Sequence, residues 1–423
     1  MRRSRHFAGA VLALGAWALL SAPRTLTSDG LQRYEDLKKL WSGGGVGGGR
    51  YSLVGPFFAS PLLGLDAVLS RPGTTAVYFN VLVFFLGLGL LWRWLRPALG
   101  VDGILAFTLL LIFGSMFPFH TLGFYGEVFT AVGLGVGIAA VVFGRQKTGI
   151  LLLTLGAANT PAALVPLGAM LALRAWRLKS PRPLILALLP LCLILTENWL
   201  RRGSPLATGY EGTHGIRTDL VYSDVVGFGF PLWIGVLSLL FSFGKGLLFF
   251  APGAFVPAFA RPPFRDQRLE ELFWLWLVGL AGFILVYAKW WQWNGDEYWG
   301  PRYLLFAGFP AALALVEACA FTSWRARAAV GLALVLSLWV GFDGLVFGQH
   351  DMSVCYGNGA QLAYLCWYTP DFSALIRPFM SPRALQGREI LLAVVWWAAA
   401  GVLLRPLASF RPTARNGAAL PSE

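Results

Sequence analysis

The chain has 423 residues, of which 57% are hydrophobic and 13% are charged, and its mean hydropathy is +0.62. Soluble domains carry about a quarter charged residues, so this composition excludes an ordinary soluble enzyme and indicates an integral membrane protein. The net charge of +13 does not indicate nucleic-acid binding, because the Lys and Arg residues lie between apolar segments and not on one basic face.

The N-terminal segment sets the predicted orientation of the chain. Arginines at positions 2, 3 and 5 precede an apolar run, Phe7 to Ala22, and cation clusters at the end of a membrane segment stay on the cytoplasmic side. The run could instead be a cleaved signal peptide, but Pro23 directly follows the small residues and makes a poor cleavage site. We therefore expect a retained first membrane segment with a cytoplasmic N-terminus.

Apolar runs and cation clusters alternate along the rest of the chain. They predict an all-α, single-domain membrane protein (residues 1–423) with about twelve membrane segments and both termini cytoplasmic. The segments are expected at about residues 7–22, 74–92, 103–117, 126–143, two within 149–173, 184–200, 247–260, 272–288, 303–321, 330–347 and 389–404. External loops are expected at residues 24–73, 201–246 and 348–388. Apolar stretches at 57–69 and 231–241 are expected to lie on the membrane surface as helices.

The stretch 149–173 has two interpretations. As one long segment it would place the cations of residues 174–182 outside, against the positive-inside rule. As two short helices that meet at Asn159-Thr160-Pro161, it keeps those cations inside, and Pro161 suits the first position of a helix capped by Thr160 or Asn159. We expect the two-helix arrangement, because broken helices at membrane depth are tolerated where they line a cavity.

Two of the four cysteines, Cys355 and Cys366, share one predicted external loop. An oxidising exterior permits a disulfide between them, and two free thiols are the other open possibility. The cysteine spacings do not match any metal-binding pattern.

Polar and charged side chains gather in the predicted external loops and at their borders with the membrane, where unpaired charge is costly. A polar cluster on one face, walled by apolar helices, is the form expected of a site that takes a lipid-borne substrate. The candidate site residues are Asp29, Arg33, Tyr34, Arg50, Tyr51, Glu127, Asn159, Arg201, Tyr210, Lys245, Asp296, Glu297 and Arg302.

Asp29 follows the first predicted membrane segment, with Arg33 and Tyr34 about one helical turn further on. Ser28 and Asp29 are both good N-cap residues, so one interpretation is that Asp29 only caps a helix starting near Leu31. The interpretation that we favour is a general base, because a carboxylate with a moderately raised pKa can take a proton from an attacking hydroxyl.

Two cations are distinguished by their neighbours. Lys245 lies between two glycines, which let a backbone approach an anion closely and favour phosphate binding over a lysine that only extends its charge to the interface. Arg302 follows Gly300-Pro301 at the start of a predicted segment, and its surroundings alone indicate an interface anchor.

The remaining carboxylates leave alternatives open. Glu127 begins a predicted helix and could complement the helix N-terminus, orient an arginine or bind acceptor hydroxyls. Asp296-Glu297 could hold a divalent cation, but adjacent carboxylates in a Trp-rich loop are more often solvated. We therefore expect no metal and no cofactor.

Several motifs, taken in order, resemble one family. They are Asp29-Gly-Leu-Gln-Arg-Tyr34, Arg50-Tyr-Ser-Leu-Val-Gly-Pro56, Gly156-Ala-Ala-Asn-Thr-Pro161, Asn198-Trp-Leu-Arg-Arg-Gly-Ser-Pro-Leu-Ala-Thr-Gly-Tyr210, Ser242-Phe-Gly-Lys-Gly-Leu-Leu-Phe-Phe-Ala-Pro252 and Trp293-Asn-Gly-Asp-Glu-Tyr-Trp-Gly-Pro-Arg-Tyr303. Over roughly residues 25–310 the chain resembles bacterial GT-C glycosyltransferases that use polyprenyl-phosphate sugars, relatives of protein mannosyltransferases and of the aminoarabinose transferase of lipid A. The first loop of that family often carries paired acids, whereas here Gly30 follows Asp29.

The resemblance implies an inverting transfer of a sugar from a polyprenyl-phosphate donor to a hydroxyl of an envelope glycan, lipid or protein, at the external face of the inner membrane. It implies that Asp29 is the general base and that Lys245, Arg302 and Arg33 bind the donor phosphate. The substrate-contacting residues would be Tyr34, Arg50, Tyr51, Glu127, Asn159, Arg201, Tyr210, Asp296 and Glu297.

Two other functions compete with this one. A transporter or flippase for a lipid-linked sugar would show midplane charges and inverted repeats, and we find no internal repeat in the sequence. A non-catalytic membrane scaffold of the same fold is the second alternative, and it would not depend on the carboxylate of Asp29.

Overall fold

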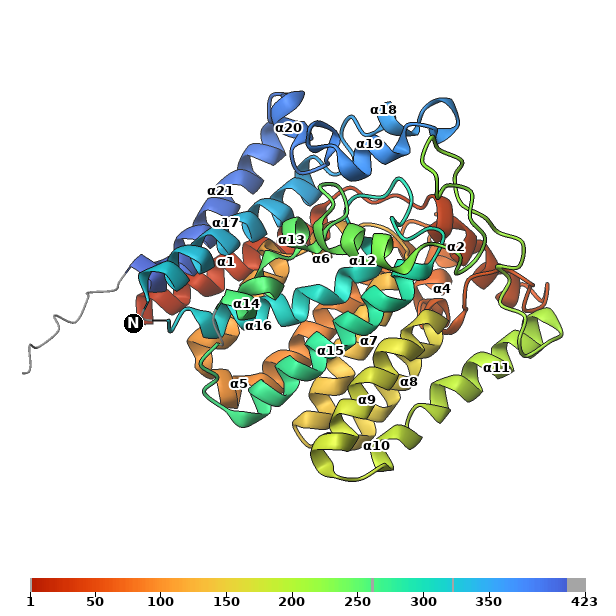
Figure 1. The fold of residues 1–423 in the computed structure, drawn as a ribbon, viewed down its shortest axis with the longest axis horizontal. Helices are drawn as coiled ribbons and strands as arrows, with labels where there is room; N and C mark the ends of the chain where they lie inside the picture. Colours follow the sequence, from red (N-terminus) through yellow and green to blue (C-terminus); the bar gives the residue numbers. More distant parts are fainter. Residues whose placement is uncertain (1, 260–261, 322, 409–423) are drawn as a thin grey trace, which may run out of the picture.

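The computed structural model describes residues 2–259, 262–321 and 323–408, which form an all-helical protein. Among these residues the β-type contacts are limited to one isolated bridge between His214 and Val226. The helices pack side by side, and the loops with the short helices α2 and α4 gather at one end of the bundle (Figure 1). One extended hydrophobic core joins the long helices.

Five helical stretches of the described chain are long and apolar enough to cross a membrane. They lie at residues 76–113, 182–202, 267–289, 324–346 and 387–407, and the shorter apolar helices are α1 (Arg2–Ser21), α7 (Gly126–Val142) and α12 (Leu232–Phe241). The prediction of a helical membrane protein is confirmed at this level, and the total of twelve segments stays a prediction.

Helix α5 (Phe79–Phe113) follows the 3-10 turn η1 (Ala76–Tyr78) and consists of two helices joined at Gly100. Gly100 has φ 71°, which a residue without a Cβ adopts freely. The ring of Phe84, near the start of α5, stacks on Phe117, just beyond its end, with centroids 4.7 Å apart. The second half of α5 therefore ends near the point where the first half begins. This antiparallel arrangement agrees with the two membrane segments predicted at residues 74–92 and 103–117.

Helices α7 and α8 (Gln146–Asn159) pack at close range because glycines face each other across the contact. A Cβ on Gly133 would lie 2.7 Å from the Cα of Gly156, and one on Gly137 would lie 2.9 Å from the backbone nitrogen of Leu153. Small residues let helix backbones approach in this way. The pairing brings the end of α8 beside the start of α7.

The chain reverses after α8, through η2 (Pro161–Ala163), into α9 (Leu164–Leu178), which packs against α15 (Gln267–Lys289). The predicted helix break is therefore present. The predicted cap is wrong, because neither Asn159 nor Thr160 makes a side-chain capping bond. Both side chains instead bind neighbouring elements, Thr160 through the hydroxyl of Thr130 at 2.8 Å.

The loop predicted at residues 24–73 folds into short helices α2 (Ser28–Trp41), α3 (Val54–Phe57) and α4 (Ser60–Val68). Buried Asp66 accepts hydrogen bonds from the backbone of Gly73 and Thr75, at 3.1 and 2.7 Å, and so fixes the turn that leads into α5. The predicted surface helix 57–69 is thus mostly α4, with exposed apolar side chains.

The predicted segment 184–200 is α10 (Arg182–Ile185) followed by α11 (Leu188–Arg202). A long irregular loop leads from α11 to α12, the predicted surface helix. Gly235 lets α12 lie directly on the backbone of Ala288 at the end of α15, and Trp233 on its other side is 74% exposed.

The predicted segment 247–260 is not one helix within the described residues, and its last residue lies outside them. Pro252 and Pro257 lack the backbone donor that a continuous helix needs. The segment is therefore divided into α13 (Leu247–Phe250), η3 (Pro252–Phe255) and α14 (Val256–Phe259). The segment predicted at 303–321 begins with a 3-10 stretch, η4 (Arg302–Ala307), before α16 (Gly308–Ala318).

Helix α17 (Trp324–Val346) and helix α21 (Gly387–Ala408) flank the loop predicted at residues 348–388. A disulfide joins Cys355 to Cys366 in this loop, with Cα atoms 5.9 Å apart, which is one of the two possibilities that the sequence left open. The short elements at this end are α6 (Phe117–His120), α18 (Ser353–Tyr356), η5 (Asn358–Ala360), α19 (Ala363–Tyr368), η6 (Pro370–Phe372) and α20 (Arg377–Met380).

Candidate active site

A cavity of about 210 Å³ lies where the loops of residues 24–73 and 201–230 meet the helix ends. Its wall is formed by α2, the loop before α3, the starts of α7 and η2, the last turns of α11, the end of α15 and residues 302–303. Seven of the predicted site residues line it: Asp29, Arg33, Arg50, Tyr51, Glu127, Tyr210 and Arg302.

Asp29 and Arg302, far apart in the sequence, form an ion pair in this wall. Nη1 of Arg302 donates to Oδ2 of Asp29 at 2.9 Å, and Oε1 of Glu127 lies 3.6 Å from the same nitrogen. Arg302 is 4% exposed, and its guanidinium lies over the ring of Tyr298, 4.2 Å from the centroid. A buried guanidinium shared by two carboxylates is a fixed positive charge, because arginine does not lose its proton in proteins.

Local structure explains how the two carboxylates reach this arginine. Asp29 lies in the first turn of α2, but Thr27 is the N-cap residue and no side chain caps the helix, so the capping interpretation of Asp29 is wrong. Glu127 lies in the first turn of α7, and its contact with Arg302 favours the role of orienting an arginine. Arg302 is the first residue of η4, directly after Pro301.

The charge state of Asp29 follows from opposing effects. Burial by itself raises the pKa of this carboxyl, but the Arg302 charge and hydrogen bonds from Tyr51 and Arg302 outweigh it, so the pKa lies below its ordinary value. The sequence-based expectation of a raised pKa for Asp29 is therefore wrong in this structure. Asp29 is ionised at neutral pH, and it is a weak base while Arg302 holds it.

Four guanidinium groups line the cavity, and each has a buried Nε atom that finds no hydrogen-bond partner in the described part of the chain: those of Arg33, Arg50, Arg202 and Arg302. Leaving a buried donor unpaired costs about 1–3 kcal/mol. The opposing carboxylates in the wall are Asp29, Glu127 and Glu197, so the positive charges exceed the negative ones by one. An oxygen-rich anion would balance this excess positive charge of the guanidinium groups.

Tyrosine rings hold two of these cations against the wall. The Arg33 guanidinium lies 4.7 Å from the centroid of Tyr51, and that of Arg50 lies 4.9 Å from Tyr51 and 5.8 Å from Tyr210. Stacking of this kind positions a guanidinium without consuming its N–H donors. The two tyrosines thus keep both arginines directed to one space.

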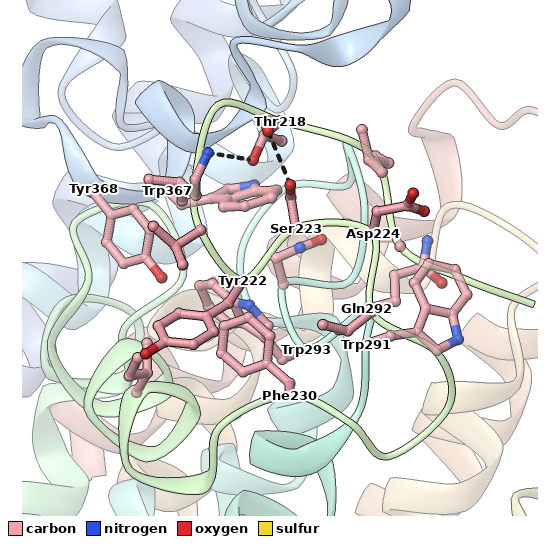
Figure 2. Close-up of a pocket in the computed structure, with 17 residues that line it drawn as sticks. Thr218, Tyr222, Ser223, Asp224, Phe230, Trp291, Gln292, Trp293, Trp367 and Tyr368 are labelled. Atoms are coloured by element: carbon pink, nitrogen blue, oxygen red, sulfur yellow. Dashed lines mark hydrogen bonds between the residues drawn. The ribbon is translucent and has the colours of Figure 1, made fainter.

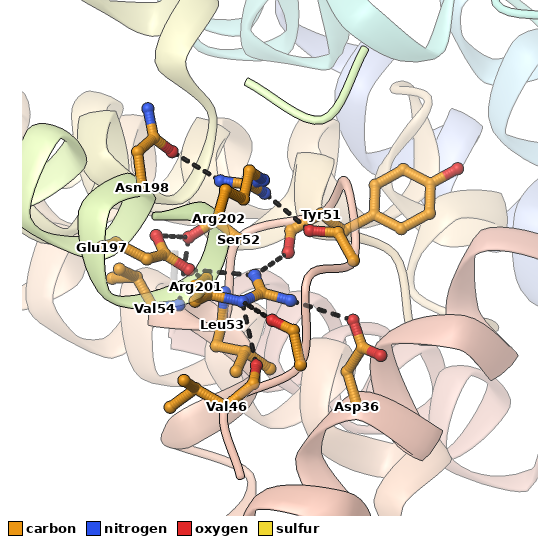
Figure 3. Close-up of polar contacts among 12 residues, drawn as sticks. Asp36, Val46, Tyr51, Ser52, Leu53, Val54, Glu197, Asn198, Arg201 and Arg202 are labelled. Atoms are coloured by element: carbon orange, nitrogen blue, oxygen red, sulfur yellow. Dashed lines mark hydrogen bonds and ion pairs between the residues drawn. The ribbon is translucent and has the colours of Figure 1, made fainter. Parts of the chain in front are cut away.

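Arg201, predicted to bind substrate, does not line the cavity. Its Nε donates to the carbonyls of Val46 and Gly47 at 3.1 and 3.0 Å, and Nη2 donates to Asp36 at 3.0 Å. Nη1 donates to the carbonyl of Tyr51 and to Glu197 (Figure 3). Arg201, on α11, therefore holds in place the loop of residues 46–51, which carries the cavity residues Arg50 and Tyr51.

Lys245, predicted to bind the donor phosphate, lies outside the cavity wall and is 1% exposed. Its Nζ donates to the carbonyls of Asp296, Tyr298 and Gly300, the first at 2.9 Å and the last at 3.3 Å. Burial, reinforced by the charge of Arg302, lowers the pKa of Lys245 to about 7. Lys245 therefore shapes the loop that precedes Arg302 and does not face the ligand space.

Tyr34 and Asn159 are also structural. The Tyr34 hydroxyl accepts a hydrogen bond from the backbone of Gly73 at 3.0 Å, in a separate small core. The Asn159 amide accepts from the backbone of Gly55 at 3.0 Å and donates to the carbonyl of Gly126 at 2.9 Å. Asn159 thus ties the first external loop to the helices behind it, and neither side chain lines the cavity.

Asp296 and Glu297 lie outside the cavity wall as well. The Asp296 carboxylate accepts a hydrogen bond from the amide of Gln292 at 2.7 Å, and Gln292 lines the cavity. Asp296 therefore positions a residue of the wall without lining the cavity itself. Glu297 is exposed. In the described residues, His, Cys, Asp and Glu side chains do not gather into groups of three or more that could hold a metal ion.

Other residues of the cavity wall, among them Glu197, Asn198 and Arg202, escaped the sequence-based prediction. Glu197 accepts from the Ser52 hydroxyl at 2.7 Å and from the backbone of Leu53 at 2.6 Å, and Arg202 donates to Asn198. Adjacent arginines on a helix point about 100° apart, so sequence alone does not tell which of them faces a cavity. Glu197 lies four residues before Arg201, so the spacing rule for helical ion pairs would have predicted their contact.

No family model, curated protein or solved structure matches the chain. What the cavity does is therefore inferred from its own geometry and charge.

Proposed function

We propose that the protein is a membrane glycosyltransferase of the GT-C type that moves a sugar from a polyprenyl-phosphate donor to an acceptor hydroxyl, with inversion. The observation that carries this proposal is the 2.9 Å contact between Asp29 and Arg302, inside a cavity that four arginines line. A potential base beside a set of anion-binding groups is what phosphate-leaving transfer needs. Two helical stretches of membrane length, 182–202 and 267–289, contribute residues to the cavity wall. A lipid-linked donor could therefore reach the cavity from the membrane along these helices.

The donor phosphate would lie among Arg302, Arg33, Arg50 and Arg202. These four guanidinium groups line the cavity, and guanidinium groups pair bidentately with phosphate oxygens. Their charge stabilises the negative charge that develops on the phosphate as it leaves. Lys245, which sequence reasoning placed here, would contribute only by shaping the loop before Arg302.

Asp29 would become an effective base when the donor binds. The incoming phosphate competes with Asp29 for Arg302, and a carboxylate that loses its cation in a buried site has a raised pKa. Asp29 then takes the proton of the acceptor hydroxyl while the acceptor oxygen attacks the anomeric carbon. The bond from that carbon to the phosphate oxygen breaks, and its electron pair leaves with the polyprenyl phosphate.

The proposed topology places this cavity on the external face of the cell inner membrane, with about twelve segments and both termini cytoplasmic. Ion pairs at the other end of the helices support it: Arg5 pairs with Asp102 at 2.8 Å, and Arg174 pairs with Glu271. Arg388, at the start of α21, donates to the carbonyl of Ala18, near the end of α1, so the two terminal helices run in opposite directions. The acceptor would be an envelope glycan, lipid or protein.

The test is transfer by purified protein supplied with a panel of polyprenyl-phosphate sugars and extracted envelope lipids and glycans, with products identified by mass spectrometry. Asp29→Asn should lower the transfer rate by about 10²–10⁴-fold, the usual contribution of a general base. Glu35→Gln is the matched control, because this exposed carboxylate lies on the same helix and pairs with Lys38 at the surface.

Full transfer activity in Asp29→Asn would contradict the proposal. Movement of intact lipid-linked sugar across proteoliposomes, without transfer, would favour a flippase. Retention of the cellular phenotype by Asp29→Asn, with neither activity, would favour a non-catalytic scaffold.

A further inference from the structure

A second cavity, of about 280 Å³, lies beside the first and shares Gln292 with it. Loop residues 215–225 form part of its wall (Figure 2). Much of the remainder is aromatic: Phe230, Trp291, Trp293, Trp367 and Tyr368. The two cavities are therefore neighbours with different linings.

The aromatic part of the wall is rigid, because its rings pack on one another. The centroid of Trp293 lies 5.5 Å from that of Trp367, 5.8 Å from that of Phe230 and 5.9 Å from that of Tyr368. The Tyr368 hydroxyl is itself fixed by the hydroxyl of Ser238 at 2.8 Å. Rings held from behind present preformed flat surfaces to whatever enters the cavity.

The polar groups of this cavity are almost all neutral. Among its lining residues, all described, Asp224 is the one charged side chain, and it is paired with His214 at 2.5 Å. The Gln292 amide donates to Asp296, the Asn294 amide accepts from the backbone of Asp296, and the buried Nε1 of Trp291 finds no partner within the described chain. Both amides are thus engaged by Asp296, and an anion would find no cation in this lining.

Loop 215–225 is closed at its base and covers the aromatic wall. The backbone of Gly215 donates to the carbonyl of Val225 at 3.0 Å, and the Ser223 hydroxyl donates to the carbonyl of Thr218 at 2.9 Å. Tyr222 contributes a further ring to the cavity wall and is 46% exposed. A ligand would thus lie between fixed rings and a loop that carries one more ring.

We propose that this second cavity binds a neutral sugar ring of the acceptor. A pyranose has an apolar face of C–H groups, which suits flat aromatic surfaces, and an edge of hydroxyls, which suits the amide and hydroxyl side chains of the lining, such as Gln292 and Ser223. The adjacent cavity takes the charged part of the donor, so the acceptor hydroxyl would reach it past Gln292. The assignment of this sugar to an acceptor rests on the proposed transfer function, whereas the binding of a sugar does not.

The test is equilibrium dialysis of the full-length protein, in a detergent without a sugar head group, against labelled methyl glycosides of glucose, galactose, mannose, N-acetylglucosamine and rhamnose. At least one glycoside should bind without any donor, and Tyr222→Ala should weaken it about tenfold, as expected for loss of one ring contact. Leu206→Ala is the control, because this side chain is 78% exposed in the same connecting loop and lies outside the cavity.

Binding of none of these glycosides, equal binding by Tyr222→Ala and unaltered protein, or binding of dodecanoate in their place would overturn the proposal. Asp29→Asn should bind the glycoside normally. Because the assay needs no donor and no transfer, glycoside binding that depends on Tyr222 would remain even if the proposed transfer failed.

Discussion

The carboxylate of Asp29 lies in a cavity wall yet is held by Arg302 at 2.9 Å. In this state its pKa is low, so it is charged and a poor acceptor of protons. A site of this kind gains a base only when another anion engages the arginine. Under the proposed function, Asp29 would therefore remove a proton only when the donor phosphate is bound in the cavity. This coupling would limit side reactions of the site in the absence of a donor.

Replacing Tyr51 by Phe tests the charge balance at Asp29. The hydrogen bond from the Tyr51 hydroxyl favours the charged carboxylate, so its loss should raise the pKa of Asp29. The acid limb of the pH profile of kcat/KM should therefore move toward neutral pH, while the ring that supports Arg33 and Arg50 is kept. Tyr34→Phe, which alters a hydroxyl outside the cavity, should leave the profile unchanged, and an unshifted profile in Tyr51→Phe would refute this balance.

Two adjacent arginines should respond differently to the same substitution. Arg201→Gln removes a guanidinium that joins Asp36, Glu197 and three backbone carbonyls, and should lower the free energy of unfolding by about 3 kcal/mol. Arg202→Gln should raise the donor KM by about tenfold, because one charge-assisted contact to phosphate is lost. Its loss of stability should be smaller than that of Arg201→Gln. Thermal unfolding and steady-state kinetics measure both. Equal effects of the two variants on KM would contradict the division of roles.

The loop from Asp296 to Arg302 is the element on which the site depends most. Lys245 holds three of its carbonyls, and the Tyr356 hydroxyl donates to the carbonyl of Asp296 at 3.2 Å. Trp367 donates to that same hydroxyl, and both residues adjoin the disulfide of the last external loop. The disulfide-bonded loop is therefore connected by hydrogen bonds to the segment that presents Arg302.

Lys245→Met should destabilise this loop. Three buried carbonyls would lose their donor, and we expect a loss of about 3 kcal/mol in the free energy of unfolding. Because the pKa of Lys245 is lowered to about 7, the unfolded chain holds a proton that the folded chain lacks between about pH 7 and the ordinary lysine pKa. Stability should therefore rise with pH in this window, and the rise should be smaller in Lys245→Met.

The matched control is Lys39→Met, an exposed lysine on α2, which should keep both the stability and its pH dependence. Melting temperatures measured in detergent from pH 6.5 to pH 10 provide the readout. A Lys245→Met variant that is as stable as the unaltered protein at every pH would show that the loop does not depend on this side chain.

Sequence reasoning succeeded for elements whose signals are local. The break at Thr160 followed from Pro161 and the cation clusters, whereas two cysteines in one polar loop left the disulfide as one of two possibilities. It failed where the partner is distant in the chain. The glycines on either side of Lys245 suggested a phosphate site, but Lys245 instead donates to carbonyls of residues 296–300. No local sequence pattern predicts this contact.

At the scale of the whole molecule, apolar content and cation spacing predicted a helical membrane protein, and the positions of the long helices agree. Helix lengths were less predictable, because prolines divide residues 247–259 and the segment predicted at 303–321 begins with the 3-10 stretch η4. The composition of the cavity depended on tertiary packing. Asp29 and Arg302 were both proposed from sequence, but their direct contact, and therefore the low pKa of Asp29, required the fold.

The most direct measurement compares donor binding with transfer in Asp29→Asn. Removing the carboxylate frees Arg302, so the purified variant should bind a polyprenyl-phosphate sugar at least as tightly as the unaltered protein while transfer falls by about 10²–10⁴-fold. Arg302→Gln should lose donor binding instead. Transfer at the unaltered rate by Asp29→Asn, or donor binding that is indifferent to Arg302, would contradict the proposed pairing of base and phosphate site.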